Sequence, residues 1–285
     1  MILKALLSGS DTILAPGICD ALTALIAEQS GAKMVYLSGA GLAYTRFGSP
    51  DIGLVSMAEV ADTIALIHDR VSIPIIVDAD NGFGNALNVQ RTMRVFERNG
   101  ANALQLEDQT MPKRCGHLDG KALISASEMA GKLHAAADAR ASDATLIIAR
   151  TDAIAVEGFE AACDRAELYI EAGADVLFIE APQNRKQLEA ISSRFGGRIP
   201  LMANMVEGGK TPIHSIADLQ TLGYSLVIFP GGIVRALAKT AGDYYRALIL
   251  TGSNESFCER MYDFDGLNGV IKTHSILSQA KKYGN

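Results

Sequence analysis

Short apolar runs alternate with longer amphipathic stretches along the chain, and this pattern predicts the fold. Several of the runs are continuous rather than alternating in polarity, which is typical of parallel strands buried on both faces. Eight runs rich in β-branched residues, each followed by a helix-like segment, cover residues 12–17, 33–39, 73–80, 102–108, 145–152, 175–181, 199–205 and 225–231. Eight strand–helix units in 285 residues predict a single α/β domain, a (β/α)8 TIM barrel over residues 1–285.

A doubly wound open sheet is the alternative arrangement of such units. It usually contains fewer strands, and its first strand leads into a glycine-rich dinucleotide fingerprint. The first glycine cluster of this chain, "SGAGLA" at residues 38–43, lacks the third glycine of that fingerprint. The barrel is therefore the better prediction, and a nicotinamide cofactor is not expected.

The chain has more helical sequence after its eighth strand than one barrel unit needs. Residues 231–252 and 255–284 read as helix, and apolar residues keep a helical spacing through residues 257–277. Apolar surface without a partner in its own barrel must find one outside it or remain as a large exposed patch. We therefore expect residues 253–285 to form a C-terminal helical extension that packs on the barrel or on a neighbouring subunit.

Composition and charge narrow the class of partner. The chain is 48% apolar, enough for a sizeable core, and its net charge of −6 gives a surface that attracts neither nucleic acid nor an anionic membrane. No apolar run reaches the roughly 18 residues of a membrane span, and the N-terminus lacks the separate regions of a signal peptide. The four cysteines are widely spaced, without a CxxC pair. A reduced, cytoplasmic protein is expected.

Polar and charged residues gather at the ends of the predicted strands. In a TIM barrel the chemistry takes place at the C-terminal ends of the strands. The residues at these ends are Ser38, Gly39, Asp78, Asp80, Glu107, Asp108, Arg150, Asp152, Glu180 and Asn204. A barrel with no catalytic role would need apolar layers and turn residues there, so this set indicates an active site.

The segment "VDAD" is the most informative of these strand ends. Asp78 and Asp80 stand two residues apart and therefore face the same side of a strand. Hard oxygen ligands of this kind suit Mg²⁺ or Mn²⁺, and Asp51 and Glu107 are further acids that could join them. The alternative is that one aspartate caps the next helix and the other meets a lysine. The metal site is the favoured interpretation.

Two arginines are candidates for holding a substrate carboxylate. Arg150 ends its strand inside the ring, where it could grip a carboxylate with two hydrogen bonds or could simply balance Glu180 or Asp152. Arg235 follows "PGG" by one helical turn and could grip another carboxylate, or it could be a solvated helix residue. Both alternatives stay open for each arginine.

A lone cysteine lies in the irregular stretch "MPKRCGHLDG" at residues 111–120. Cys115 has Lys113, Arg114 and His117 as neighbours, and such cations stabilise a thiolate. The stretch could also be an exposed basic loop in which a cysteine happens to lie. On these residues alone the loop remains the simpler interpretation, because a lone cysteine signals catalysis weakly.

Six motifs occur together in barrel order: "YLSGAG", "VDADNGFGNALNV", "LQLEDQTMPKRCGH", "IARTDA", "FIEAP" and "NMVEGGKTP". Together they resemble the phosphoenolpyruvate mutase/isocitrate lyase superfamily over essentially the whole chain. The segment "KRCGH" resembles the signature of its carbon–carbon lyases, including isocitrate lyase and 2-methylisocitrate lyase. The phosphonate-processing members generally lack that cysteine motif.

The resemblance implies a Mg²⁺-dependent retro-aldol cleavage of a 2-hydroxy di- or tricarboxylate, by residues with distinct roles. Asp80 would bind the metal directly, and Asp51, Asp78 and Glu107 would hold its waters. The keto-acid carboxylate would lie on Ser38, Gly39, Ala40 and Arg150, and the other end of the substrate would meet Glu180, Asn204 and Arg235. Cys115, beside Gly116 on a mobile loop, would protonate the carbanion, with Lys113, Arg114 and His117 stabilising its thiolate. Tyr36 is a candidate for the base.

The resemblance also has consequences for assembly and substrate. It implies a homotetramer built from two pairs of subunits that exchange a C-terminal helix. The methylisocitrate-cleaving members show three glycines where this chain has "GAG", and a hydrophobic-small pair where it has Gly231 and Gly232. The segments "DADNGFGNALNVQRT" and "NMVEGGKTP" are more similar to the branch of 2,3-dimethylmalate lyase and the petal death protein. Carboxyphosphonoenolpyruvate mutase-like chemistry, oxaloacetate hydrolysis and a non-catalytic ligand-binding barrel remain the alternatives.

Overall fold

Eight parallel strands close into a barrel in the order in which they follow one another along the chain. The computed structural model describes residues 2–116, 118, 120–212 and 215–284. The strands are β1 (Ile13–Ile18), β2 (Val35–Leu37), β3 (Ile75–Asp78), β4 (Ala103–Glu107), β5 (Leu146–Thr151), β6 (Val176–Ile179), β7 (Leu201–Asn204) and β8 (Leu226–Phe229). Each lies within or overlaps one of the eight apolar runs, so the predicted TIM barrel is confirmed.

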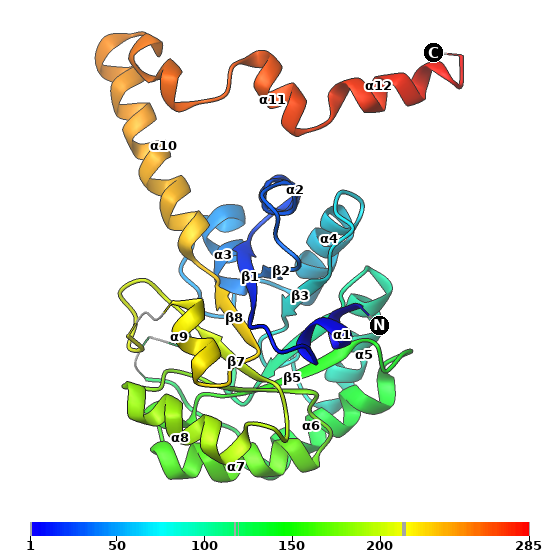
Figure 1. Cartoon of the computed structure of the whole chain (residues 1–285), viewed down its shortest axis with the longest axis vertical. Coiled ribbons are helices and arrows are strands. Elements are labelled where there is room, and N and C mark those ends of the chain that lie inside the picture. The colour runs from blue at the N-terminus through cyan, green and yellow to red at the C-terminus, as the bar shows by residue number, and fades with distance from the viewer. Residues whose placement is uncertain (1, 117, 119, 213–214, 285) are drawn as a thin grey trace. The chain divides into compact units, whose positions relative to one another are not determined.

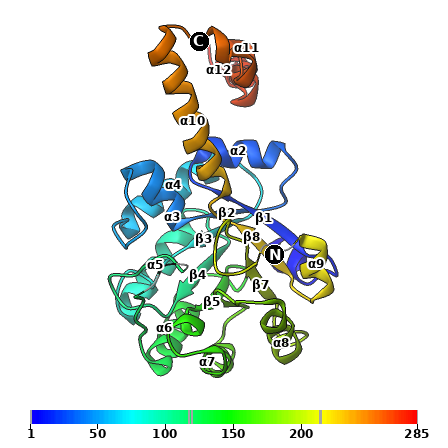
Figure 2. The ribbon, with the colours of Figure 1, turned by 90° about the vertical axis from the view of Figure 1, so that its left-hand side faces the viewer.

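Helices connect successive strands and cover the outside of the barrel (Figures 1 and 2). The barrel unit contains α1 (Ile2–Leu7), α2 (Ala21–Gln29), α3 (Gly39–Phe47), α4 (Met57–His68), α5 (Ala86–Arg98), α6 (Ala126–Ala139), the 3₁₀ turn η1 (Ala153–Ala155), α7 (Phe159–Glu171), α8 (Arg185–Phe195) and α9 (Ile216–Thr221). Side-chain caps set several helix starts. Ser56, for example, forms a capping box with Glu59 at the beginning of α4.

Apolar side chains fill the barrel and the space between strands and helices. Tyr36, Ile76, Ile148 and Phe178 belong to one cluster of buried residues drawn mainly from the strands. Leu3 and Leu7 of α1 join this same cluster, which explains why the N-terminal residues form an amphipathic helix rather than a free end. The interior is therefore a packed core, and the chemistry has to take place at its rim.

The residues after the barrel form a second compact unit. The chain divides into Met1–Gly232 and Ile233–Asn285. The second unit holds α10 (Gly232–Thr251), which begins at the boundary, a 3₁₀ turn η2 (Glu255–Arg260), α11 (Phe264–Val270) and α12 (Thr273–Lys281). The extra C-terminal helices are thus present, and the unit that contains them begins about twenty residues before the predicted start at residue 253. None of the helices in the described part of the chain combines the length and apolarity required to cross a membrane.

Candidate active site

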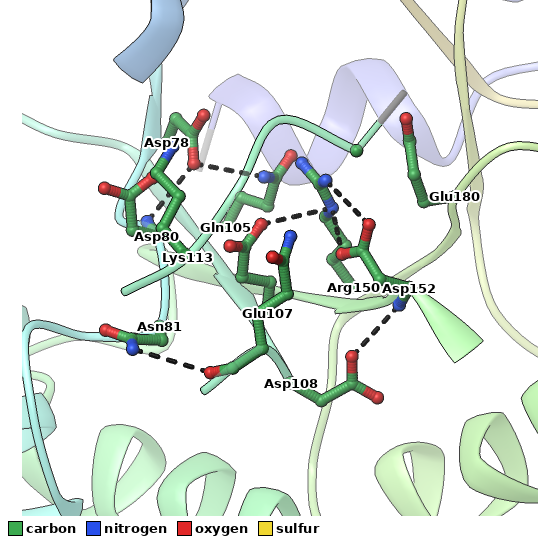
Figure 3. A network of polar contacts seen from close by, with 12 residues as sticks. Asp78, Asp80, Asn81, Gln105, Glu107, Asp108, Lys113, Arg150, Asp152 and Glu180 are labelled. Carbon is green, nitrogen blue, oxygen red and sulfur yellow. Dashed lines mark hydrogen bonds and ion pairs between the residues drawn. The ribbon is translucent and has the colours of Figure 1, made fainter. Parts of the chain in front are cut away.

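The C-terminal ends of the barrel strands bring the predicted acids and Arg150 together in one buried cluster (Figure 3). Asp78 ends β3 and Glu107 ends β4, while Arg150 is the second-last residue of β5. Asp80 follows β3 in a left-handed backbone conformation with φ of 46°, which is uncommon for a residue with a side chain. Such backbone strain is characteristic of functional sites.

A lysine from the cysteine-containing stretch lies among these acids. Lys113 Nζ is 2.5 Å from Asp51 Oδ1 and 2.7 Å from Asp80 Oδ1, and all three side chains are at most 8% exposed. Asp80 therefore meets a lysine, as one of the two interpretations of "VDAD" required. The stretch is also tied to the same place through its backbone, because the Cys115 N–H donates to the Asp51 carbonyl oxygen at 3.3 Å.

Burial and neighbouring negative charges raise the pKa of two of these acids, Asp80 and Glu107. Burial, helped by the neighbouring charges of Asp78 and Asp51, raises the pKa of Asp80 to about 7, although Lys113 opposes the shift. Burial also raises the pKa of Glu107 well above its ordinary value, against the opposing charge of Arg150. A divalent cation bound beside them would favour the ionised form of both carboxyl groups.

The oxygen atoms of this cluster fit a hard divalent cation. Glu107 Oε1 is buried and accepts no hydrogen bond from any described residue, and Asp80 Oδ1 has only its ion pair with Lys113. Within the described ranges, however, no group of three His, Cys, Asp or Glu side chains already stands in a metal-binding arrangement. The carboxylates are the right type for Mg²⁺, but Lys113 currently takes two of them.

Gln105 links the tyrosine and aspartate of the site, a role that sequence reasoning missed. The Tyr36 hydroxyl donates to Gln105 Oε1 at 2.8 Å, and Gln105 Nε2 donates to Asp78 Oδ1 at 3.2 Å. Burial, followed by the charge of Asp78, raises the pKa of Tyr36 well above its ordinary value, so Tyr36 remains a neutral phenol. The signal available in the sequence was a polar glutamine inside the apolar run "ALQLE". The structure buries this side chain completely.

Arg150 is held by acids on both sides. Its Nε and Nη2 donate to the two carboxylate oxygens of Asp152 at 2.9 and 3.1 Å, and Nε is 3.3 Å from Glu107 Oε2. The guanidinium also lies over the ring of Phe178. Of the two balancing partners considered for Arg150, Asp152 forms a two-bond pair with it, and that pair fixes the plane of the guanidinium.

Gly116 packs directly against the side chains expected to hold substrate. A Cβ atom at this position would lie 2.5 Å from Arg150 Nη2 and 2.6 Å from Glu180 Oε1, so a larger residue would displace both. Asn204 Nδ2 in turn lies 3.2 Å from each Glu180 oxygen. The structure therefore brings Gly116, Arg150, Glu180 and Asn204 together. The half-buried Cys115 directly precedes Gly116 in the chain.

The start of α3 lies against the aspartates. Ser38 caps this helix by accepting a hydrogen bond from the Gly41 N–H at 3.1 Å, and Ala40 lies in its first turn. The Gly39 N–H donates to Asp78 Oδ2 at 3.3 Å. The predicted "SGA" segment is therefore adjacent to the acid cluster, with its Gly39 amide directed at one of those acids.

The remaining predicted residues are Arg114, Arg235 and His117. The Arg114 side chain is exposed, and its backbone N–H and carbonyl groups both bond to the side chain of Gln109. Arg235 belongs to α10 in the second unit. His117 lies outside the described residues.

A family model for phosphoenolpyruvate phosphomutase matches residues 3–249 of this chain. The chain belongs to the phosphoenolpyruvate mutase/isocitrate lyase superfamily, as the six motifs predicted. Its lyase relatives include the 2-methylisocitrate lyase of Aeropyrum pernix, 44% identical over 96% of this chain and 87% of that protein. The 2,3-dimethylmalate lyase of Eubacterium barkeri is 38% identical over 99% and 96%.

Relatives with other chemistry also match. The chloroplastic carboxyvinyl-carboxyphosphonate phosphorylmutase of Arabidopsis thaliana is 38% identical over 96% of this chain and 81% of that protein. Among solved structures, an oxaloacetate acetylhydrolase with 3,3-difluorooxalacetate superposes with a TM-score of 0.94 at 28% identity, covering 100% and 96% of the two chains. A phosphonopyruvate hydrolase with oxalate and Mg²⁺ gives 0.88 at 27%, covering 100% and 98%.

Proposed function

We propose that this protein is a Mg²⁺-dependent carbon–carbon lyase that cleaves a 2-hydroxy carboxylate of the substituted-malate or methylisocitrate type. The products would be pyruvate or another α-keto acid and a carboxylic acid. The observation that carries this proposal is the position of residues 113–116, the described part of the "KRCGH" segment. Its Lys113 pairs with Asp51 and Asp80, and its Gly116 packs on Arg150 and Glu180. Cys115 lies between Lys113 and Gly116 in the sequence, so both of these contacts hold the backbone beside it at the site.

Asp80, Asp78, Asp51 and Glu107 would hold the metal and its waters. When bound, Mg²⁺ would supply Lewis-acid chemistry that lowers the pKa of a substrate hydroxyl. The backbone of Ser38, Gly39 and Ala40 and the guanidinium of Arg150 would bind the carboxylate of the emerging keto acid. Glu180, Asn204 and Arg235 would bind the other end of the substrate.

Cys115 would supply the proton that ends the reaction. Breaking the carbon–carbon bond leaves a carbanion that must be protonated, and a thiol is an acid of suitable strength for that step. Lys113, Arg114 and His117 would stabilise the resulting thiolate. Because burial raises the pKa of Tyr36, this residue would act as a neutral hydrogen-bonding group to substrate and not as the base.

Oxaloacetate hydrolysis is the second candidate, because an oxaloacetate acetylhydrolase superposes on this chain so closely. A panel of phosphonopyruvate, oxaloacetate, 2-methylisocitrate and 2,3-dimethylmalate, assayed by product formation with and without EDTA, separates the candidates. We expect cleavage of an alkylmalate or methylisocitrate that EDTA abolishes. Turnover of phosphonopyruvate alone would contradict the lyase proposal.

Replacement of Asp80 tests the metal site in the same assay. Asp80→Ala should lose divalent-cation binding in calorimetry and nearly all turnover, because it removes the proposed direct ligand. Its circular dichroism should match that of the unmodified protein, since the residue lies beyond the end of β3. Full activity of Asp80→Ala, or of the unmodified protein in excess EDTA, would contradict the metal assignment.

The assembly that we propose is a cytoplasmic homotetramer, a pair of dimers that exchange C-terminal helices. The barrel unit ends just after β8, so its own residues supply helices after β1 to β7 only. An apolar groove of about 510 Å³ runs beside β1, the end of α2 and the start of α9, and is lined by Leu14, Pro16, Ala27, Ala32 and Ile216 among others. A helix from a second copy would suit this groove.

A further inference from the structure

Lys121, just after the cysteine-containing stretch, has a buried charge that the proposed chemistry does not use. Its side chain is 1% exposed, and Asp152, with which it pairs, is fully buried. A buried ion pair costs desolvation energy and is weak evidence for a purely stabilising role. The partners of Lys121 therefore suggest what else it does.

The ammonium group of Lys121 makes two contacts, one to the loop and one to the barrel. It donates to the backbone carbonyl oxygen of Gly116, and it lies 3.0 Å from Asp152 Oδ1. Gly116 belongs to residues 113–116, here called the cysteine loop. Asp152 follows β5 directly, and its N–H donates to Asp108 Oδ1 at 3.0 Å, so it is fixed from the barrel side.

Asp152, which pairs with Lys121, also binds Arg150 of the site. The oxygen that meets Lys121, Oδ1, also accepts from Arg150 Nη2 at 3.1 Å, and Oδ2 accepts from Arg150 Nε at 2.9 Å. Burial opposes the ionisation of Asp152, but Arg150 and Lys121 together outweigh it and lower its pKa. Lys121 thus joins the cysteine loop to the group that orients Arg150.

We propose that Lys121 is a positioning residue that holds the cysteine loop against Arg150, so that Cys115 and the guanidinium reach their working positions together. The active-site consequence rests on the proposed lyase function, whereas the holding of the loop does not. Loss of the ammonium would release the Gly116 carbonyl and leave Arg150 with a less constrained Asp152. Cys115 would then become more accessible.

The test measures access to Cys115 directly. Cys258→Ser removes the exposed cysteine, and Cys19 and Cys163 are buried. In this background, iodoacetamide labelling of Cys115 is followed by peptide mass spectrometry for Lys121→Met and for Lys186→Met, an exposed control on α8. Lys121→Met should label about tenfold faster or more, the scale expected when a charged hydrogen bond is lost. Lys186→Met should label at the background rate.

A second variant separates positioning from folding. Asp152→Asn should also accelerate labelling, and the double variant with Lys121→Met should label no faster than the faster single variant, because both act through one connection. A folded Lys121→Met that labels within twofold of the background overturns the proposal. If Lys121→Met fails to fold, a folded Asp152→Asn with unchanged labelling overturns it, and unfolding of both makes Lys121 structural and overturns it too.

Steady-state kinetics distinguish this proposal from the proposed function. With whichever substrate the unmodified protein cleaves, Lys121→Met should lower kcat/KM by about 10- to 100-fold, on the scale of a misplaced reacting group. Lys186→Met should retain the original value. If no substrate of the panel is cleaved, the lyase function fails, while the labelling result still decides the role of Lys121.

Discussion

Lys113 and Arg150 are buried cations, and each of them pairs with two acids of this site. Lys113 pairs with Asp51 and Asp80, and Arg150 pairs with Asp152 and Glu107. Burial opposes the charge of Lys113, yet Asp80 and Asp51 raise its pKa well above its usual range, so it remains an ammonium. Cys115 lies two residues from this ammonium in the chain, and we propose that Lys113 helps to stabilise its thiolate.

Cys115→Ser tests the chemistry of that cysteine. A hydroxyl is a far weaker acid than a thiol, so kcat should fall by about 10²–10⁴, the usual contribution of a general acid. Substrate binding, measured by calorimetry in the presence of Mg²⁺, should change much less because the volume of the side chain is nearly conserved. Turnover within a few-fold of the unmodified protein would make Cys115 an ordinary loop residue.

At the scale of elements, Asp108 links the ends of β4 and β5 to α7 through hydrogen bonds and an ion pair. This buried carboxylate follows β4, and it accepts from Thr151 Oγ1, the Asp152 N–H and the Tyr169 hydroxyl at 2.7 to 3.0 Å. Arg165 of α7 adds an ion pair at 3.3 Å. The strand ends that carry Glu107 and Arg150 are therefore held in register by one side chain beneath the site.

Asp108→Ala should destabilise the barrel strongly. It removes one ion-pair partner of Arg165 and leaves the Thr151 hydroxyl, the Asp152 N–H and the Tyr169 hydroxyl without this acceptor, at a cost of about 3–5 kcal/mol. At about 2–4 °C per kcal/mol for a chain of this size, calorimetry should show Tm lower by about 10 °C. Asp138→Ala, which removes an exposed carboxylate on α6, should leave Tm unchanged. Equal Tm values for the two variants would show that Asp108 does not stabilise the contact between β4, β5 and α7.

At the scale of the whole molecule, the second unit carries large apolar side chains that solvent can reach. Ile249, Leu250, Phe264 and Tyr283 are each more than 80% exposed. Side chains of this size usually lie inside a core or an interface. Together with the apolar groove beside β1, they support assembly between copies of the chain.

Removal of residues 255–285 should therefore give unstable or aggregated protein rather than an active monomer. The apolar groove and the exposed face of α10 would lose the partner that we propose for them. Light scattering of the intact chain at micromolar concentration should give the mass of a tetramer. A monomeric mass for the intact chain, or an active monomer after truncation, would refute the exchanged-helix assembly.

The sequence by itself determined the barrel, because eight apolar runs and the helices between them leave few other ways to bury their surface. It also placed Asp78, Glu107 and Arg150 at one rim, since parallel strands bring their C-terminal ends together. Only the tertiary structure decided which side chains meet. Lys113 lies 62 residues from Asp51 in the chain and Tyr36 lies 69 from Gln105, and local patterns do not specify such pairings. Lys121 was missed for the same reason: its partners, a backbone carbonyl and a distant aspartate, are brought to it by the folded loop and not by any repeat or spacing in the sequence.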